Sequence, residues 1–259
     1  MLGVGALFSG LLGTPFVARR FVFPVQDVRS LPSLPVPPDV LVHRLVARDG
    51  VRVRALELPR PDSPRTIVYF HNNRETAESL VGLARGLRAR GFEVVLAEYR
   101  GYGGSSGGTP SEQGLYLDAE AVLDMLDSRG TGRDRVVLWG TSLGSGVAAE
   151  MASRGRGARL VLVSPYTSIP DLVSHAVPPL PARALVWDHF DTLAKSAAIH
   201  VPTLVVHGDA DEIVPFAMGE RLSSAIAGAR LLRISGGHHG DLFVRDGDRL
   251  LSEITIFAG

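Results

Sequence analysis

The motif with the clearest chemical meaning is Gly140-Thr141-Ser142-Leu143-Gly144, in which one serine stands between two glycines. It follows the apolar run Val136–Trp139, which is typical of a strand, and it leads into Leu143–Arg154, which has a helical pattern. A serine on a sharp turn between strand and helix is exposed at the end of a sheet, beside the positive end of the helix dipole. We therefore predict that Ser142 is a nucleophile.

A serine hydroxyl reacts readily only when a base takes its proton and an acid orients that base. Asp209 and Asp211 follow the strand-like run Thr203–His207, and His238 and His239 follow the last strand-like run. The order serine, acid, histidine is the one found where a serine occupies such a turn. The carboxyl ends of parallel strands also meet at one edge of a sheet. Spacing alone leaves the choice within each pair open.

Acyl transfer also requires N–H donors for the oxyanion that forms during attack. One is expected to be the backbone N–H of Leu143, which directly follows the serine. The other is expected from the loop after an early strand, here His71–Arg74 after Thr66–Phe70. Asparagine is also a good helix cap, so a purely structural role for Asn72 and Asn73 is the alternative.

Strand-like and helix-like segments alternate from Thr66 onward. Before them, Val40–Ala47 and Val51–Leu58 flank Asp49-Gly50, which predicts an antiparallel hairpin. Apolar strands separated by amphipathic helices predict an α/β fold, with a mostly parallel central sheet and helices on both faces. The predicted strands are Thr66–Phe70, Phe92–Ala97, Arg135–Trp139, Arg159–Val163, Thr203–His207 and Arg230–Ile234, and the predicted helices include Thr76–Arg90, Ser111–Ser128, Leu143–Arg154 and Phe216–Ile226.

The alternation is interrupted between Ser164 and Val201, where five prolines accompany apolar residues without a strand pattern. Long excursions between core strands are usually lids or binding segments, so residues 165–201 are predicted to form a small lid. A surface excursion without function is the alternative. The side chains predicted to line an acyl pocket are Ile169, Leu172, Val177, Leu180 and Trp187.

The N-terminal region is predicted to have two parts before the domain at residues 40–259. Residues 1–23 form an apolar segment, without a charged side chain up to Arg19, and residues 24–39 form a proline-rich, extended connector. The segment is short for a membrane span and contains glycines, so membrane anchoring and packing against the domain both remain open. If it anchors, Arg19 and Arg20 favour a cytoplasmic domain. The predicted location is cytoplasmic, or membrane-associated and facing the cytoplasm, with Met1–Val22 dispensable for folding.

Composition narrows the classes of function. The 259 residues include 27 Lys+Arg and 27 Asp+Glu, and this net charge of zero argues against nucleic-acid binding. The absence of cysteine excludes a thiol nucleophile and thiolate metal sites. No His-Glu-x-x-His motif occurs, so neither a metal nor another cofactor is expected. The predicted partner is a small-molecule ester or an acylated substrate, with possible membrane association; the sequence leaves the oligomeric state open.

Several motifs together resemble the serine α/β-hydrolases of the Bem46 and ABHD13/ABHD17-like group, close to the serine aminopeptidase S33 domain. The resemblance extends from about Thr66 to Leu242. Its motifs are Glu98–Gly107, Pro110–Leu115 with Asp118-Ala119, Trp139–Gly146, Ser164–Ser168 and His207–Pro215. Together they are specific for the family and say little about any one substrate.

The resemblance implies an α/β-hydrolase fold and selects within the open pairs. In the family pattern the second acid of His-Gly-Asp-x-Asp is catalytic, which implies Asp211, and the catalytic histidine follows Gly-Gly, which implies His238. The third residue of the family's His-Gly-Asn loop supplies the second oxyanion N–H, which implies Asn73. Asn72 departs from the family, which usually has glycine at that position.

The function expected from these residues is hydrolysis of a carboxylic ester or thioester, with an acyl or lipid-type substrate, through an acyl-enzyme. Because the family is also named for peptidases, a serine peptidase or amidase of the S33 type is the alternative among enzymes. A non-catalytic binding module with this fold is the alternative outside enzymes. The complete set of Ser142, an acid and a histidine favours the esterase interpretation.

Overall fold

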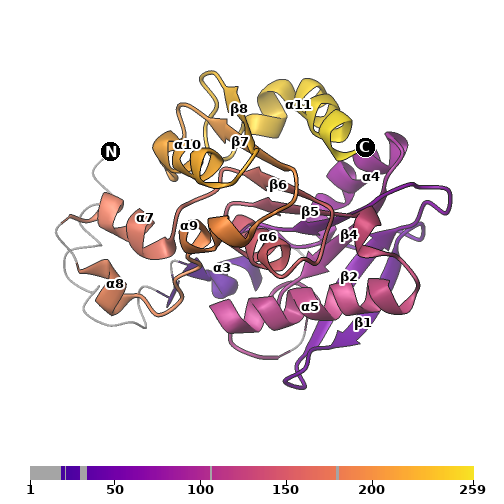
Figure 1. Cartoon of the computed structure of the whole chain (residues 1–259). Coiled ribbons are helices and arrows are strands. Elements are labelled where there is room, and N and C mark those ends of the chain that lie inside the picture. Colours follow the sequence, from indigo (N-terminus) through magenta and orange to yellow (C-terminus); the bar gives the residue numbers. More distant parts are fainter. Residues whose placement is uncertain (1–18, 21, 30–33, 106, 179–180) are drawn as a thin grey trace.

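A computed structural model describes residues 19–20, 22–29, 34–105, 107–178 and 181–259 of the chain. The described residues form one eight-stranded sheet with the order β1-β2-β4-β3-β5-β6-β7-β8 (Figure 1). β2 is antiparallel to both β1 and β4, and the other neighbouring strands are parallel. The strands are β1 (Leu41–Val46), β2 (Arg52–Leu58), β3 (Thr66–Phe70), β4 (Glu93–Glu98), β5 (Val136–Thr141), β6 (Arg159–Val163), β7 (Thr203–Gly208) and β8 (Arg230–Ile234). The predicted fold class, with its antiparallel N-terminal hairpin, is confirmed.

Helices cover both faces of this sheet. They are α3 (Val25–Arg29), α4 (Val81–Ala89), α5 (Glu112–Ser128), α6 (Leu143–Ser153), α7 (Ile169–Ala176), α8 (Ala182–Leu185), α9 (Thr192–Lys195), α10 (Phe216–Ala225) and α11 (Leu242–Ala258). Short 3₁₀ turns lie at η1 (Glu78–Leu80), η2 (Arg133–Arg135) and η3 (Ser196–Ala198). In the part of the chain that the structure describes, no helix is both long and apolar enough to cross a membrane.

Two apolar cores lie on opposite faces of the sheet because successive strand residues point to opposite sides. In β3, Val68 and Phe70 belong to the core under α5 and α6, whereas Ile67 and Tyr69 belong to the core under α4 and α11. Figure 1 shows α5 and α6 over the near face of the sheet. Burial on both faces explains why the parallel strands are continuous apolar runs in the sequence.

The N-terminal region differs from the expected extended connector. Residues Val25–Arg29 form α3, directly after Pro24, and proline is well tolerated where a helix begins. Val22, Phe23 and Val28 are buried in the same core as α5 and α6. This part of the chain therefore packs on the domain, and deletion up to Val22 would remove a core side chain. Residues 1–18 of the predicted apolar segment, for which anchoring and packing were both left open, lie outside the described residues.

The predicted lid region contains α7, α8, α9 and η3. Figure 1 shows α7 and α8 at one end of the molecule, beyond the edge of the helical layer. Two backbone hydrogen bonds join the beginning of the insertion to its later part: Ile169 N donates to His189 O (2.8 Å), and Leu193 N donates to Thr167 O (3.0 Å). Residues 165–201 therefore form a folded unit between β6 and β7, interrupted by two residues that the structure does not describe.

Candidate active site

The turn that carries Ser142 has a strained backbone. Ser142 has φ 51° and ψ −117°, which is rare for a residue with a side chain. The turn is also very tight: a Cβ atom on Gly140 would lie 2.2 Å from the Gly144 carbonyl oxygen, and one on Gly144 would lie 2.0 Å from that of Phe70. Glycine is therefore required at both positions. The turn places Ser142 directly before α6 and packs Gly144 against the end of β3.

Ser142 lies at one end of a chain of hydrogen bonds that passes through a histidine to an acid. The Ser142 Oγ atom is 3.0 Å from Nε2 of His239, and Nδ1 of His239 is 2.8 Å from Oδ2 of Asp211. Ser142 follows β5, His239 follows β8 and Asp211 follows β7. The carboxyl ends of three strands therefore bring these residues together. The predicted Ser142 and Asp211 are both in this chain.

The histidine of the chain is His239, so the expectation that His238 contacts Ser142 is wrong. His238 points to the surface, where its Nδ1 atom is 3.1 Å from Glu212 Oε2 and its side chain is 52% exposed. Its backbone N–H donates to Asp241 Oδ1 at 2.7 Å, which fixes the turn that follows. Because the two histidines are neighbours in a tight loop, only one of them can face the serine.

The loop path that selects His239 is set by contacts with the β7 end. The Gly237 carbonyl accepts a hydrogen bond from Ala210 N at 3.1 Å, and a Cβ atom on Gly208 would lie 2.1 Å from that carbonyl oxygen. Gly236 adopts φ 64°, a conformation that glycine tolerates without strain. The glycines thus hold the two loops together, and it is the His239 imidazole that turns back toward the end of β5.

The two aspartates of the β7 loop have different surroundings. The fully buried Asp211 side chain accepts hydrogen bonds from the backbone of Ile213 (3.0 Å) and Val214 (2.8 Å) in addition to its contact with His239. Asp209 instead accepts from Gly236 N at 2.6 Å and from Arg233 at 2.8 Å. Asp209 therefore links β8 to the loop, and Asp211 is the acid that faces the histidine.

A second histidine, His207, lies against the same acid and was not among the predicted site residues. Its Nε2 atom is 3.3 Å from Asp211 Oδ2 and 2.9 Å from the Val214 carbonyl oxygen, and its side chain is fully buried. Burial alone would raise the pKa of Asp211, but hydrogen bonds from His207 and His239 lower it by more. The pKa of this carboxyl therefore lies well below its usual range. The carboxylate is thus negative and fixed. The sequence signal was its place four residues before Asp211 in the His-Gly-Asp-x-Asp motif.

The loop after β3 approaches the serine turn, as expected for an oxyanion loop. A Cβ atom on Gly144 would meet the His71 carbonyl oxygen at 2.8 Å, so the start of α6 touches this loop. Leu143 is the first residue of α6, and N–H groups in the first turn of a helix have no partner within the helix. Asn72 is not in the left-handed region, so the glycine expected there is not required. The Asn73 side chain donates from Nδ2 to the Val22 carbonyl oxygen at 3.1 Å.

Two acids hold the His71–Arg74 loop, and neither was among the predicted site residues. Oε2 of Glu75 accepts from Asn72 N at 3.2 Å. Burial raises the pKa of Glu75 above its usual value, although the Asn72 hydrogen bond and the nearby His71 and His239 lower it. Oε1 of Glu98 lies 3.3 Å from Nε2 of the fully buried His71. The loop therefore rests on buried polar groups rather than on apolar packing alone.

The residues predicted to line an acyl pocket lie in different environments. Ile169 is buried in the same apolar core as Leu143, and Leu172 packs against that core. Val177 is partly buried at the end of α7. Trp187 is 70% exposed, so its ring is not enclosed in a pocket, contrary to expectation. Leu180 lies outside the described residues.

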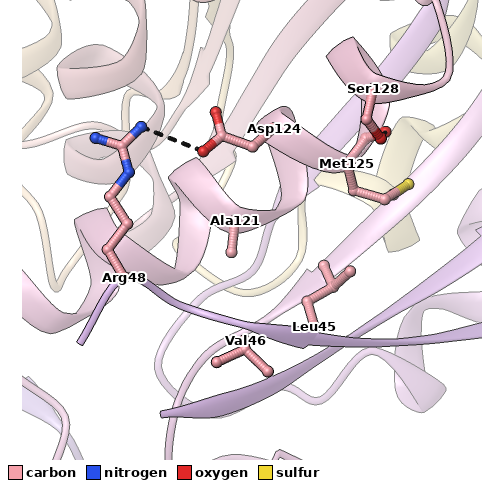
Figure 2. Close-up of a pocket in the computed structure, with 7 residues that line it drawn as sticks. All are labelled: Leu45, Val46, Arg48, Ala121, Asp124, Met125 and Ser128. Carbon is pink, nitrogen blue, oxygen red and sulfur yellow. Dashed lines mark hydrogen bonds and ion pairs between the residues drawn. The ribbon is translucent and has the colours of Figure 1, made fainter. Parts of the chain in front are cut away.

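A hollow of about 350 Å³ lies between β1 and α5, away from Ser142 (Figure 2). It is lined by Leu45, Val46, Arg48, Ala121, Asp124, Met125 and Ser128. Figure 2 shows an ion pair at its rim, with Arg48 Nη2 3.2 Å from Asp124 Oδ2. Its lining residues come from β1, the turn after β1 and α5, and none belongs to the loops that carry Ser142, Asp211 and His239, so this hollow is separate from the hydrogen-bonded chain. Among the described residues, no group of three or more His, Asp or Glu is arranged to hold a metal ion.

Comparisons with known proteins agree with this architecture. Residues 61–190 match the family described as "Serine aminopeptidase, S33". An uncharacterised protein of Mycobacterium tuberculosis is 35% identical over 248 residues, which cover 92% of this chain and 86% of that protein. The lysophosphatidylserine lipase ABHD12 of Macaca fascicularis is 34% identical over 187 residues, which cover 64% of this chain and 46% of that protein. The esterase Pf2001 of Pyrococcus furiosus has a similar fold, with a TM-score of 0.74, 16% identity and coverage of 88% of this chain and 96% of its own.

Proposed function

The chain belongs to the serine aminopeptidase S33 family of α/β-hydrolases, and we propose that it is a serine hydrolase acting on a carboxylic ester or thioester through an acyl-enzyme. The observation that supports this most is the chain of hydrogen bonds from Ser142 through His239 to Asp211. A serine, an imidazole and a fixed carboxylate in this order are what general-base activation of a serine requires.

In the proposed mechanism, His239 Nε2 accepts the Ser142 hydroxyl proton while Oγ attacks the acyl carbon. The imidazolium then donates from Nδ1 to Asp211, whose negative charge stabilises it. The backbone N–H groups of Leu143 and Asn73 donate to the oxyanion of the tetrahedral intermediate. When the intermediate collapses, the bond between carbonyl carbon and leaving group breaks, and His239 gives its proton to the leaving alcohol or thiol. Water, activated by the same imidazole, then releases the acid from Ser142.

An ester or thioester is favoured over a peptide for two reasons. A relative named a lipase and a solved structure named an esterase share this sequence family and this fold, respectively. The insertion also contributes apolar side chains to the core that contains Leu143, with Ile169 in that core and Leu172 packed against it, which suits an acyl chain better than a charged peptide terminus. The S33 name keeps a peptidase or amidase as the alternative. Membership of the narrower Bem46 and ABHD13/ABHD17-like group stays a prediction.

Labelling with a fluorophosphonate tests the mechanism, because this probe bonds only to an activated serine. The parent chain should be labelled and Ser142→Ala should not, and turnover of a p-nitrophenyl ester should fall by at least about 10³-fold in the variant. Ser145→Ala is the matched control, because it removes a hydroxyl three residues away that is not the nucleophile: Ser145 Oγ donates to the Ser142 carbonyl oxygen at 2.6 Å. This variant should still be labelled. Absence of labelling in the parent chain would favour the non-catalytic binding module.

A substrate series then separates the enzyme classes. We expect the ratio kcat/KM for p-nitrophenyl esters to rise with acyl length and then fall, and aminoacyl p-nitroanilides to be poor substrates. The reverse preference, with anilides turned over faster than esters, would establish the peptidase alternative. Rates that do not depend on acyl length would contradict the proposed acyl pocket while leaving the Ser142 mechanism intact.

A further inference from the structure

A buried histidine lies next to the acid that faces His239. This residue, His207, belongs to β7, and its side chain is fully buried. Its neighbours in the strand are the buried apolar residues Leu204, Val205 and Val206. A polar ring in such a strand lowers stability unless its nitrogen atoms have hydrogen-bond partners. The presence of an imidazole here therefore calls for a reason other than packing.

The two ring nitrogens of His207 have different surroundings. Nε2 is 2.9 Å from the Val214 carbonyl oxygen and 3.3 Å from Oδ2 of the ionised Asp211. Both oxygens can only accept, so we assign the proton to Nε2. Nδ1 has no hydrogen-bond partner among the residues that the structure describes, and a Cβ atom on Gly219 would lie 2.4 Å from it. A second proton, on Nδ1, would be buried without an acceptor, so the ring is neutral.

The Nε2–H group of His207 completes a ring of contacts around the Asp211 carboxylate. Val214, whose carbonyl accepts from His207, donates its own N–H to Asp211 Oδ1 at 2.8 Å. The other carboxylate oxygen, Oδ2, faces His207 Nε2 and also accepts from His239 Nδ1 at 2.8 Å. Two imidazole N–H groups thus converge on one oxygen atom, one from β7 and one from the loop after β8.

Helix α10 packs against the Nδ1 edge of the His207 ring. Gly219 approaches this edge so closely that a side chain there would displace the ring. The Phe216 ring packs edge-on against the imidazole, with 5.7 Å between ring centroids. Both residues belong to α10, which begins directly after the loop that carries Asp211. The imidazole is therefore confined between this helix and the acid.

We propose that His207 is a positioning residue, whose Nε2–H group fixes the Asp211 carboxylate in the orientation that accepts from His239. A histidine base works only when its acid holds the ring in the correct tautomer and orientation. Without the His207 N–H, the backbone of Ile213 and Val214 still holds Oδ1, but among the described residues Oδ2 keeps only its contact with His239. The effect on rate rests on the proposed function, whereas the orientation of the carboxylate can be measured without a reaction.

Two substitutions of His207 test the role of its N–H group. His207→Leu fills the space without a donor, and kcat for a short p-nitrophenyl ester should fall about 10-fold while KM stays within about 2-fold. In His207→Gln the amide nitrogen can take the place of Nε2, so kcat should recover to at least about half of the parent value. A parent-like kcat in His207→Leu, or an equal loss in both folded variants, would overturn the proposal.

Gly219→Ala disturbs the same contact without changing any residue of the hydrogen-bonded chain. The added carbon would lie 2.4 Å from His207 Nδ1, so the ring must shift, and kcat should fall by about 3-fold or more. Gly82→Ala in α4 is the matched control and should keep the parent kcat. Apart from the helix's own backbone, no atom of the described residues lies within 4 Å of a carbon added there. If His207→Leu does not fold, this pair decides: a parent-like kcat in both glycine variants would overturn the proposal.

A measurement without turnover separates this proposal from the proposed function. In the Ser142→Ala protein, the proton that His239 donates to Asp211 should give a downfield ¹H NMR resonance, which further substitution by His239→Ala identifies by its loss. Adding His207→Leu should broaden this resonance through faster exchange with water, and His207→Gln should preserve it. An unchanged resonance with His207→Leu, or no such resonance in the Ser142→Ala protein, would overturn the positioning role. A parent chain that hydrolyses no ester, with the resonances as expected, would instead refute only the proposed function.

Discussion

The hydrogen-bonded chain at Ser142 and the 165–201 insertion lie side by side but are held by different forces. Close backbone contacts between glycines and neighbouring loops fix the first region, as at Gly144 against Phe70 and at Gly208 against Gly237. Side-chain contacts attach the second region: Lys195 lies 2.6 Å from both the Tyr116 hydroxyl and Glu150 Oε2. The chemistry thus depends on geometry that has little freedom. The region expected to recognise the substrate depends on polar links that can change without disturbing the reacting groups.

The largest expected effect concerns the choice between the two histidines. His239→Ala should lower ester turnover by about 10³-fold or more, because no other imidazole lies within hydrogen-bond distance of Ser142 among the described residues. His238→Ala removes only a contact with the exposed Glu212 and should retain more than about half of the parent activity. Steady-state rates and melting curves of both variants decide the assignment. An inactive, folded His238→Ala protein beside an active His239→Ala protein would contradict the described loop path.

The next effect breaks the backbone contacts of the first region. In Gly144→Ala, the added carbon would meet the Phe70 carbonyl at 2.0 Å, and no side-chain rotation relieves a clash with backbone. We expect either insoluble protein, or a soluble protein whose α6 has moved and whose fluorophosphonate labelling rate is at least about 100-fold lower.

Gly86→Ala in α4 is the matched control for this clash. There the nearest atoms to an added carbon are 3.7 Å away, and alanine favours a helix by about 1 kcal/mol over glycine. The control should keep full activity and melt at or slightly above the parent temperature. Normal labelling of Gly144→Ala would show that the turn is looser than described.

A smaller effect is expected from the polar links of the insertion. Lys195→Met removes the cation between Tyr116, Glu150 and Glu112, which are contributed by α5 and α6. Burial alone would raise the pKa of Glu150, but Lys195 and Arg154 lower it by more. Removal of the lysine therefore leaves a partly buried carboxylate with less positive charge beside it. We expect a loss of about 1–2 kcal/mol, or roughly 2–8 °C in melting temperature. The kcat for a short ester should stay within about 2-fold, while KM for a long-chain ester should rise.

Arg85→Met is a suitable control for Lys195→Met, because it breaks an exposed ion pair with Asp39. Exposed pairs contribute little to stability, so the melting temperature should change little and both kinetic constants should stay at parent values. A fall in kcat for short esters in Lys195→Met would mean that the insertion also positions the reacting groups, and the separation of the two regions would be wrong.

The inner parallel strands could be predicted from the sequence because each is an apolar run that is almost wholly buried. The edge strand β8 is exposed or partly buried along its length, but it still contains Leu231, Leu232 and Ile234. β3, β6 and β8 have the predicted bounds. The C-terminal helix α11 was not predicted, although Leu250, Leu251 and Ile254 lie at helical spacing and are buried. Short apolar runs in a parallel sheet are a stronger local signal than an amphipathic helix with many charged residues.

The part of the site that could not be predicted depends on tertiary contacts. Gly140, Ser142 and Gly144 are recognisable because a tight turn needs these residue types. The choice of His239 over His238 depends on how Gly237 docks against Gly208, and no local pattern encodes that contact. The prolines between residues 24 and 38 likewise favour an extended chain, but burial of Val28 stabilises the short helix α3.

The smallest expected effect concerns Glu75, a carboxyl group within the rigid region. Burial raises the pKa of Glu75 in the folded state, so the folded protein holds this proton more tightly than the unfolded chain does. The free energy of unfolding must then fall as the pH rises from the pKa of the unfolded chain to the higher pKa of the folded protein. This loss of stability persists at higher pH. Glu75→Gln removes that cost, and its amide oxygen can still accept from Asn72 N. The variant should melt about 2 °C above the parent protein at pH 8, and this difference should shrink as the pH approaches 4.

Glu212→Gln is the control for Glu75→Gln, since the same substitution then falls on an exposed side chain near the same site. The pKa of Glu212 is lowered in the folded state by a backbone hydrogen bond and by His238, so its removal should not stabilise the protein at pH 8. Melting curves of both variants between pH 4 and 8 provide the test. A constant difference between Glu75→Gln and the parent over this range would mean that Glu75 acts through packing, because a pKa difference requires a stability difference that varies with pH. A difference that shrinks toward low pH would show that the His71–Arg74 loop is held by a partly buried carboxylate at a cost in stability, which is the behaviour expected where a fold holds polar groups for chemistry.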